Sequence, residues 1–144
     1  MTTHVLVPVD GSDPADAALE FALSEYPDAT ITALHVIDPA DVRGSTVIES
    51  GAPETYAEYR TRQQERGDDV LADARARADD HGVTIGTEQM IGGVVPSIVG
   101  FAEGNDADHI VMGSHGRTGA SRVLLGSVAE NVVRRAPVPV TVVR

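Results

Sequence analysis

The 144-residue sequence contains no cysteine, no lysine and no tryptophan. Without cysteine, disulfides, thiolate catalysis and cysteine-ligated zinc or iron–sulfur sites are excluded. Without lysine, the phosphate-binding lysine of a P-loop is excluded too, since all eleven basic residues are arginine. Two phenylalanines and three tyrosines leave few side chains that could stack on a flavin, so an FMN carrier is a distant alternative.

Acidic residues outnumber basic ones by 22 to 11, and the formal net charge is −11. This balance argues against nucleic-acid binding, which depends on clustered Lys and Arg. The acid excess is spread along the chain. Together with the absence of lysine, it is typical of proteins that work in concentrated salt, where the Debye length shrinks to about 3 Å at 1 M. We therefore expect a halophilic, haloarchaeal source, and an ordinary acidic bacterial protein is the alternative.

The length fits one domain, which we expect to span residues 1–144. The sequence shows no run of some 18 apolar residues and no charged-then-apolar leader. These features predict a cytoplasmic protein without a membrane partner.

Strand and helix patterns alternate along the chain. The predicted strands are Val5–Val9, Ile31–Ile37, Val83–Ile91, His109–Met112 and Val138–Val143. The predicted helices start at Asp13-Pro14 and span about Glu54–Asp80, Pro96–Glu103 and Val128–Arg135. In the first helix, the spacing of Ala17, Ala18, Phe21 and Ala22 predicts a core-facing side. The alternation indicates an α/β fold, a three-layer sandwich around parallel strands.

Glycines flank the fourth predicted strand and the last predicted helix. Gly113 and Gly116 follow the strand, and Gly126-Ser127 comes after nine intervening residues. Glycine at such places leaves N–H groups that can point at an anion, which the dipole of the helix favours. The spacing fits neither a P-loop nor the dinucleotide fingerprint. The motif therefore predicts a different phosphate cradle.

The pattern Gly113-x-x-Gly116-x9-Gly126-Ser127 resembles the nucleotide-binding signature of the universal stress protein family, in its ATP-binding subgroup. The resemblance covers essentially the whole chain, including Val5 to Ser12, Ala33 to Ile37 and Leu125 to Arg144. It implies a five-stranded parallel sheet of order 3-2-1-4-5, the adenine nucleotide alpha hydrolase-like fold. In such a sheet the order reverses between the first and fourth strands, where ligands bind.

The resemblance also implies a set of contacts to ATP. Val36 corresponds to the position whose backbone recognises adenine, and Pro8 and Val9 would line the same pocket. The phosphates and ribose would lie against the glycine motif. The predicted ATP-binding residues are Pro8, Val9, Asp10, Val36, Met112, Gly113, Ser114, His115, Gly116, Arg117, Gly126, Ser127 and Val128.

Several of these residues have a second interpretation. Asp10 is predicted to meet a ribose hydroxyl or a nucleotide-bound Mg²⁺ or Mn²⁺, or else Asp10-Gly11-Ser12 is turn chemistry alone. Ser127 is predicted to contact the ligand or to cap its own helix in a capping box with Glu130. Arg117 either screens phosphate charge or is simply solvated.

We assign no catalytic residue and no metal-ligand set of the protein's own. His115 lies between two glycines of the motif, but no carboxylate stands at a fixed spacing to make it a general base. The other histidines lack metal-ligand spacing.

Three functions are consistent with this sequence. The first is an ATP-binding homodimeric module that senses or regulates in the stress response, with the loops Asp38 to Pro53 and Ser114 to Leu125 changing order on binding. The second is a slow ATPase or phosphoryl-transfer enzyme on the same fold. The third is a nucleotide-independent interaction protein. The resemblance implies dimerisation through the last strand, Val138 to Val143, whose Pro139 suits a sheet edge.

Overall fold

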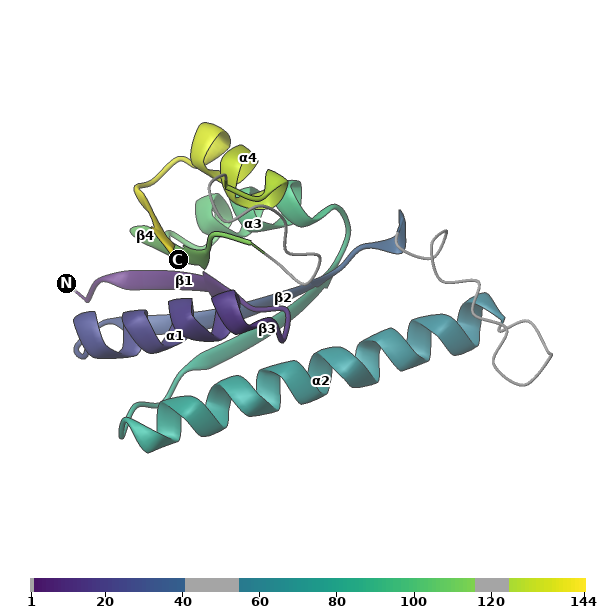
Figure 1. The fold of residues 1–144 in the computed structure, drawn as a ribbon, viewed down its shortest axis with the longest axis horizontal. Coiled ribbons are helices and arrows are strands. Elements are labelled where there is room, and N and C mark those ends of the chain that lie inside the picture. The colour runs from purple at the N-terminus through teal and green to yellow at the C-terminus, as the bar shows by residue number, and fades with distance from the viewer. Residues whose placement is uncertain (1, 41–54, 116–124) are drawn as a thin grey trace.

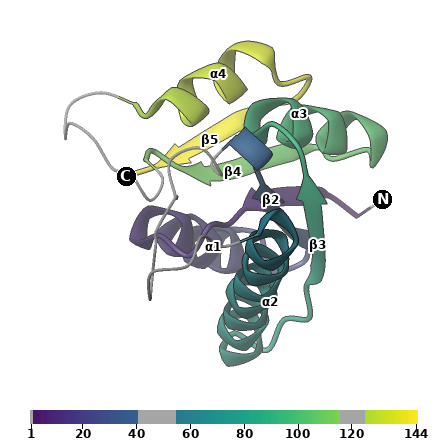
Figure 2. The same ribbon diagram turned by 90° about the vertical axis from the view of Figure 1, so that its right-hand side faces the viewer.

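The computed structural model describes residues 2–40, 55–115 and 125–144. The elements are β1 (His4–Pro8), α1 (Asp13–Glu25), β2 (Thr30–Ile37), α2 (Tyr56–Asp80), β3 (Gly86–Ile91), α3 (Val94–Gly104), β4 (His109–Gly113), α4 (Ser127–Arg135) and β5 (Val140–Val143). The strands within these ranges form one parallel sheet of order β3-β2-β1-β4-β5. Helices α1 and α2 cover one face, and α3 and α4 cover the other (Figures 1 and 2). The predicted α/β architecture and strand order are confirmed.

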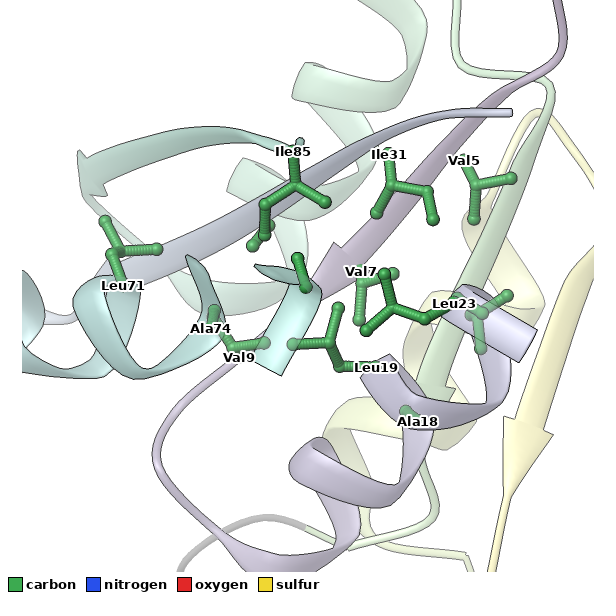
Figure 3. Close-up of a cluster of buried hydrophobic side chains, with 14 residues drawn as sticks. Val5, Val7, Val9, Ala18, Leu19, Leu23, Ile31, Leu71, Ala74 and Ile85 are labelled. Atoms are coloured by element: carbon green, nitrogen blue, oxygen red, sulfur yellow. The ribbon is translucent and has the colours of Figure 1, made fainter. Parts of the chain in front are cut away.

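The sheet buries a separate hydrophobic core on each face. In β1, Val5 and Val7 pack toward α1 and α2, whereas Leu6 between them packs toward α3 and α4. All three side chains are fully buried, and Figure 3 shows the first of the two cores. Strands covered on both faces read as continuous apolar runs. This explains why the β1 sequence is apolar without alternation.

Helix α1 is set by its cap and by a stripe of small and branched apolar residues. Ser12 is its N-cap, with the hydroxyl oxygen accepting from the Ala15 N–H at 3.3 Å. Its buried residues are Ala15, Ala18, Leu19, Ala22 and Leu23. Ala18, Ala22 and Phe21 were predicted correctly, since Phe21 is partly buried and packs against the same core, whereas Ala17 lies at the half-buried flank of this stripe. The core-facing side therefore lies closer to the leucines than predicted.

The predicted start of β3 is wrong by three residues, since the strand begins at Gly86 and not at Val83. The Val83 N–H donates to the Ala78 carbonyl at 2.9 Å and so closes the end of α2. Gly82, with φ of 70°, makes the left-handed turn that this closure needs. The chain enters the sheet only after it has completed the end of the helix.

The predicted start of β5 is also too early, because the strand begins at Val140 and not at Val138. Proline has no N–H for a ladder, and the Pro139 carbonyl makes the first contact by accepting from the Ile110 N–H at 3.0 Å. Beside this strand, His109 Nε2 lies 2.7 Å from Thr141 Oγ1. Burial lowers the pKa of His109, which favours its neutral form.

The helices begin close to their predicted starts. Helix α2 begins at Tyr56 after Thr55, whose hydroxyl oxygen accepts from the Glu58 N–H. Helix α3 begins at Val94, and Pro96 lies in its first turn, where a missing N–H costs no hydrogen bond. None of the described helices is both long and apolar enough to cross a membrane.

Arg77 joins the C-terminal half of α2 to α1 through charged contacts. Its guanidinium lies 3.1 Å from Asp16, 3.5 Å from Glu20 and 2.9 Å from Asp73. Burial raises the pKa of Asp16, and the charge of Arg77 offsets part of that rise. These groups remain partly exposed, so each pair contributes only up to about 1 kcal/mol. The apolar contacts of Leu71, Ala74 and Ala78 dominate this packing.

Gly113 generates a stability prediction, because a Cβ there would lie 2.7 Å from the carbonyl carbon and oxygen of Pro14. Main-chain atoms yield little, so Gly113→Ala should lower the free energy of unfolding by about 1–3 kcal/mol. Gly100→Ala is the matched control on the exposed side of α3, where an added Cβ meets no described atom within 4 Å. That control should be more stable by about 0.5–1 kcal/mol. Urea unfolding measures both, and equal stability of the two variants would contradict this account.

Candidate functional site

β1 and β4 are neighbours in the sheet, and both end at the same edge because parallel strands share a direction. The chain leaves β1 for α1 on one face and β4 for α4 on the other (Figure 2). Ligands of open α/β sheets bind beyond the carboxyl ends of the strands, where the strand order reverses. The residues around Asp10, Gly113 and the start of α4 are therefore the candidate site.

Asp10 builds the turn that leads from β1 into α1. Its Oδ1 accepts hydrogen bonds from the Ser12 N–H at 3.0 Å and from the Ser12 hydroxyl. Gly11 between them has a φ of 81°, in the left-handed region that favours glycine. Asp10 thus forms the turn that leads into α1, as one of its two interpretations expected. Its contact with a ligand stays a prediction. The hydrogen bonds from Ser12 fix the orientation of the Asp10 carboxylate.

The two described glycines of the motif bring parts of the chain itself together. Gly113 lets α1 approach β4 at Pro14. Gly126 lets the start of α4 approach Ser114, the residue after β4. Its N–H donates to the Ser114 carbonyl at 2.7 Å, and an added Cβ would lie 3.0 Å from that oxygen. Both glycines therefore have a packing role that needs no ligand. Their predicted approach to phosphate stays a prediction.

Helix α4 begins without a side-chain cap. Its N-cap is Gly126, and the first intrahelical bond runs from the Glu130 N–H to the Gly126 carbonyl at 3.0 Å. The capping-box interpretation of Ser127 is wrong, because Ser127 is already the first helical residue and Glu130 pairs with Arg134 at 3.0 Å instead. The first N–H groups of a helix have no intrahelical acceptor. Together with the helix dipole, those of Ser127 and Val128 can bind an anion.

Ser114 and His115 lie between β4 and the described start of α4. Ser114 is buried, and its N–H donates to the Val143 carbonyl at 2.9 Å. Its hydroxyl lies 3.1 Å from His115 Nδ1. Within the described residues, His115 Nε2 is a buried side-chain nitrogen without a hydrogen-bond partner. Such an atom costs about 1–3 kcal/mol unless a hydrogen-bond partner satisfies it.

The residues predicted to line the adenine pocket, and Met112 from the predicted ATP-binding set, lie on both faces of the sheet. Val36 and Met112 pack into the core under α3 and α4, whereas Val9 packs into the core under α1 and α2. Pro8, the last residue of β1, pairs with Leu34 and is half-buried. The structure therefore brings the side chains of Val36 and Met112 to the same face, and leaves that of Val9 on the other.

Two of the predicted site residues, Gly116 and Arg117, lie outside the described residues, as do most of the loop from Asp38 to Pro53 and most of the loop from Ser114 to Leu125. In the part of the chain that the structure describes, no three His, Asp or Glu side chains are placed to hold a metal ion.

Two residues that contact the end of β1 escaped the sequence analysis, His35 and Arg66. Buried His35 donates from Nδ1 to the Val9 carbonyl at 2.8 Å, and Arg66 Nη2 donates to the Asp10 carbonyl at 3.4 Å. One signal was present for Arg66. It precedes Gly67, a glycine within a predicted helix, and such a glycine often marks close packing.

The sequence model described as Usp, Universal stress protein family, matches residues 1–144. The chain is 38% identical over 143 residues to Universal stress protein MJ0531 of Methanocaldococcus jannaschii, covering 97% of this chain and 81% of that one. It superposes on the solved structure of MJ0577 from the same organism with a TM-score of 0.81 and 30% identity, over 99% of this chain and 96% of that one. A universal stress protein in complex with cAMP superposes with a TM-score of 0.72 and 25% identity, over 99% and 97% of the two chains.

The uncapped start of α4 generates the next prediction. Ser127→Ala should leave the free energy of unfolding within about 0.5 kcal/mol of wild type, because the hydroxyl caps no helix. Thr55→Ala is the matched control, since the Thr55 hydroxyl accepts from the Glu58 N–H at 3.1 Å and loss of such a cap costs about 0.5–2 kcal/mol. Chemical unfolding compares the two variants. A loss at Ser127 as large as that at Thr55 would restore the capping interpretation.

Proposed function

The chain belongs to the universal stress protein family, and from that premise we propose that it binds an adenine nucleotide, ATP first among them, at the carboxyl ends of β1 and β4. The observation that carries the proposal is the uncapped start of α4, at the edge where β1 delivers Asp10. An anionic ligand would satisfy the N–H groups of Ser127 and Val128. The similar protein solved with cAMP supports adenine as the base.

In this proposal each part of the ligand meets a different element. The adenine lies on the side of Val36 and Met112, and the ribose lies near Asp10. The phosphates lie at the start of α4, with His115 Nε2 as a further polar partner. Mg²⁺ or Mn²⁺ would arrive bound to the phosphates, because Asp10 supplies a carboxylate but the described residues hold no set of three ligands.

We propose binding, and not turnover, as the function of this site in a cytoplasmic stress response. Phosphoryl transfer needs a positioned nucleophile and charge stabilisation in the transition state. In the described part of the site, Asp10 Oδ1 is held by Ser12, and His115 Nδ1 faces the Ser114 hydroxyl. A bound nucleotide then acts as a signal through the chain segments that surround it.

Ser127→Pro tests the phosphate contact. Proline is favoured at the first helical position, and Gly126 with φ of −63° and ψ of 159° has the extended conformation that precedes proline readily. The variant should keep its stability but lose one N–H to phosphate, so ATP should bind about 10- to 100-fold more weakly. Calorimetry with Mg²⁺ at low and high salt measures this, with Ser127→Ala as the control that keeps the N–H.

Equal ATP affinity in Ser127→Pro and Ser127→Ala would place the phosphates elsewhere. A folded wild-type protein that binds no ATP, ADP or AMP would reject the proposal and favour a nucleotide-independent interaction protein. Formation of ADP from added ATP by the repurified protein, with loss of this activity in Asp10→Asn, would favour the slow ATPase.

We also propose a homodimer formed by β5, the last strand in the order of the sheet. The Pro139 carbonyl accepts from Ile110 in β4 and the Val143 carbonyl accepts from Ser114 just after it, and backbone groups alternate along a strand. The N–H and C=O groups of Val140 and Val142 therefore point away from β4. An apolar edge of this kind is open to pairing with a second copy.

Val142→Pro tests the dimer, since it removes an outward N–H and keeps the bonds to β4. The variant should be monomeric at concentrations where the wild type sediments as a dimer in analytical ultracentrifugation. Val142→Ala shortens the same side chain, which packs against the core, but keeps the N–H. It should remain dimeric. A monomeric wild type would contradict the proposal, and so would a dimeric proline variant.

A further inference from the structure

Two consecutive carbonyl groups just beyond β1 are held by side chains from other elements. The Val9 carbonyl accepts from His35 Nδ1 at 2.8 Å, and the Asp10 carbonyl accepts from Arg66 Nη2 at 3.4 Å. Asp10 Oδ1 is held from the other side by Ser12. The exit of β1 is thus fixed both by its own turn and by α2.

Gly67 explains how α2 comes near enough for this contact. It is buried in the middle of α2, and a Cβ there would lie 2.8 Å from Cδ2 of His35. Glycine inside a helix lowers its stability by about 1 kcal/mol relative to alanine. The close packing at Gly67 therefore accounts for a residue that helix propensity alone would disfavour. The close approach places Arg66, the preceding residue, over the Asp10–Gly11 turn. A Cβ on Gly11 would lie 3.8 Å from Arg66 Nη2 and 3.3 Å from Val70.

We infer that Arg66 is a positioning residue of the proposed nucleotide site, which holds the main chain at Asp10 so that the carboxylate is presented to the ribose. The inference rests on the proposed function. Arg66 comes from the face of the sheet that α1 and α2 cover, whereas α4 lies on the other face (Figure 2). Arg66 therefore acts through Asp10 and not by contact with the phosphates.

The positive charge of Arg66 could itself strengthen nucleotide binding, and the experiment distinguishes this electrostatic effect from a positioning effect. In a chain of net charge −11, any arginine near the site favours an anionic ligand. That electrostatic effect would grow with the number of phosphates on the ligand. A positioning effect would be the same for adenosine and for ATP, because both carry the ribose.

Arg66→Gln is compared with Arg75→Gln, which removes the same charge from the same helix. Arg75 donates to Thr87 Oγ1 at 2.8 Å, on β3. Arg66→Gln should lower the affinities for adenosine and for ATP by the same factor, about 2- to 10-fold, as expected for one lost hydrogen bond. Arg75→Gln should bind both as the wild type does. Unchanged affinities in Arg66→Gln, or weaker ATP with unchanged adenosine, would overturn the inference.

A double-mutant cycle with Asp10→Asn tests whether Arg66 acts through Asp10. The effect of Arg66→Gln on adenosine should disappear in the Asp10→Asn background, whereas independent effects would multiply and overturn the inference. Arg66→Lys, which keeps the charge, serves in the same cycle should the glutamine variant be unstable.

Hydrogen exchange of the ligand-free protein tests the positioning role without any nucleotide. The Ser12 N–H is bonded to Asp10 Oδ1, so its exchange reports on the turn. It should speed up by about 2- to 10-fold in Arg66→Gln and stay unchanged in Arg75→Gln. Unchanged exchange in Arg66→Gln would overturn the inference. A wild type that binds no nucleotide would reject the proposed function, and this readout would still decide the role of Arg66 in the turn.

Discussion

The close contact between Gly113 and Pro14 sets the geometry on which the rest of the candidate site depends. It fixes how near the first turn of α1 lies to the end of β4, and with it how near the Asp10 turn lies to Ser114. Gly126 repeats the arrangement one step further on, against the Ser114 carbonyl. A chain of direct contacts thus joins the exit of β1 to the start of α4. The site is a property of how the loop ends pack, and the strands only bring those ends to one edge.

The two faces of the sheet contribute unequally to this edge. The face of α3 and α4 supplies the groups that we propose to meet the ligand, Val36, Met112 and the start of α4. The face of α1 and α2 supplies support, through His35, Arg66 and the close approach at Gly67. The groups that we propose to contact the ligand thus come from one face, and the other face holds the turn that carries Asp10.

Periodic patterns predicted the fold well, and single residues predicted the site less well. Continuous apolar runs and their alternation with helical patterns predicted the α/β class and most boundaries to within three residues, whereas the strand order was implied by the family resemblance. The errors arose where a backbone group had a competing use, as when the Val83 N–H closes α2, or where proline has no N–H, as at Pro139. Ser127 was ambiguous because a capping box and a helix start after Gly126 share one sequence. His35 and Arg66 were missed because contacts between segments distant in sequence leave no motif spacing, and Gly67 beside Arg66 was the one local signal.

The packing role of Gly113 and Gly126 bears on how the motif would change over evolutionary time. A lineage that gave up its ligand would still be selected against any larger residue at either position, because the cost would appear in folding and not in binding. Freedom to drift would be felt first at positions such as Ser127, whose exposed side chain supports no packing and caps no helix. In related chains, the two glycines would therefore indicate common descent, whereas the residues at the start of α4 would indicate whether a ligand is still bound.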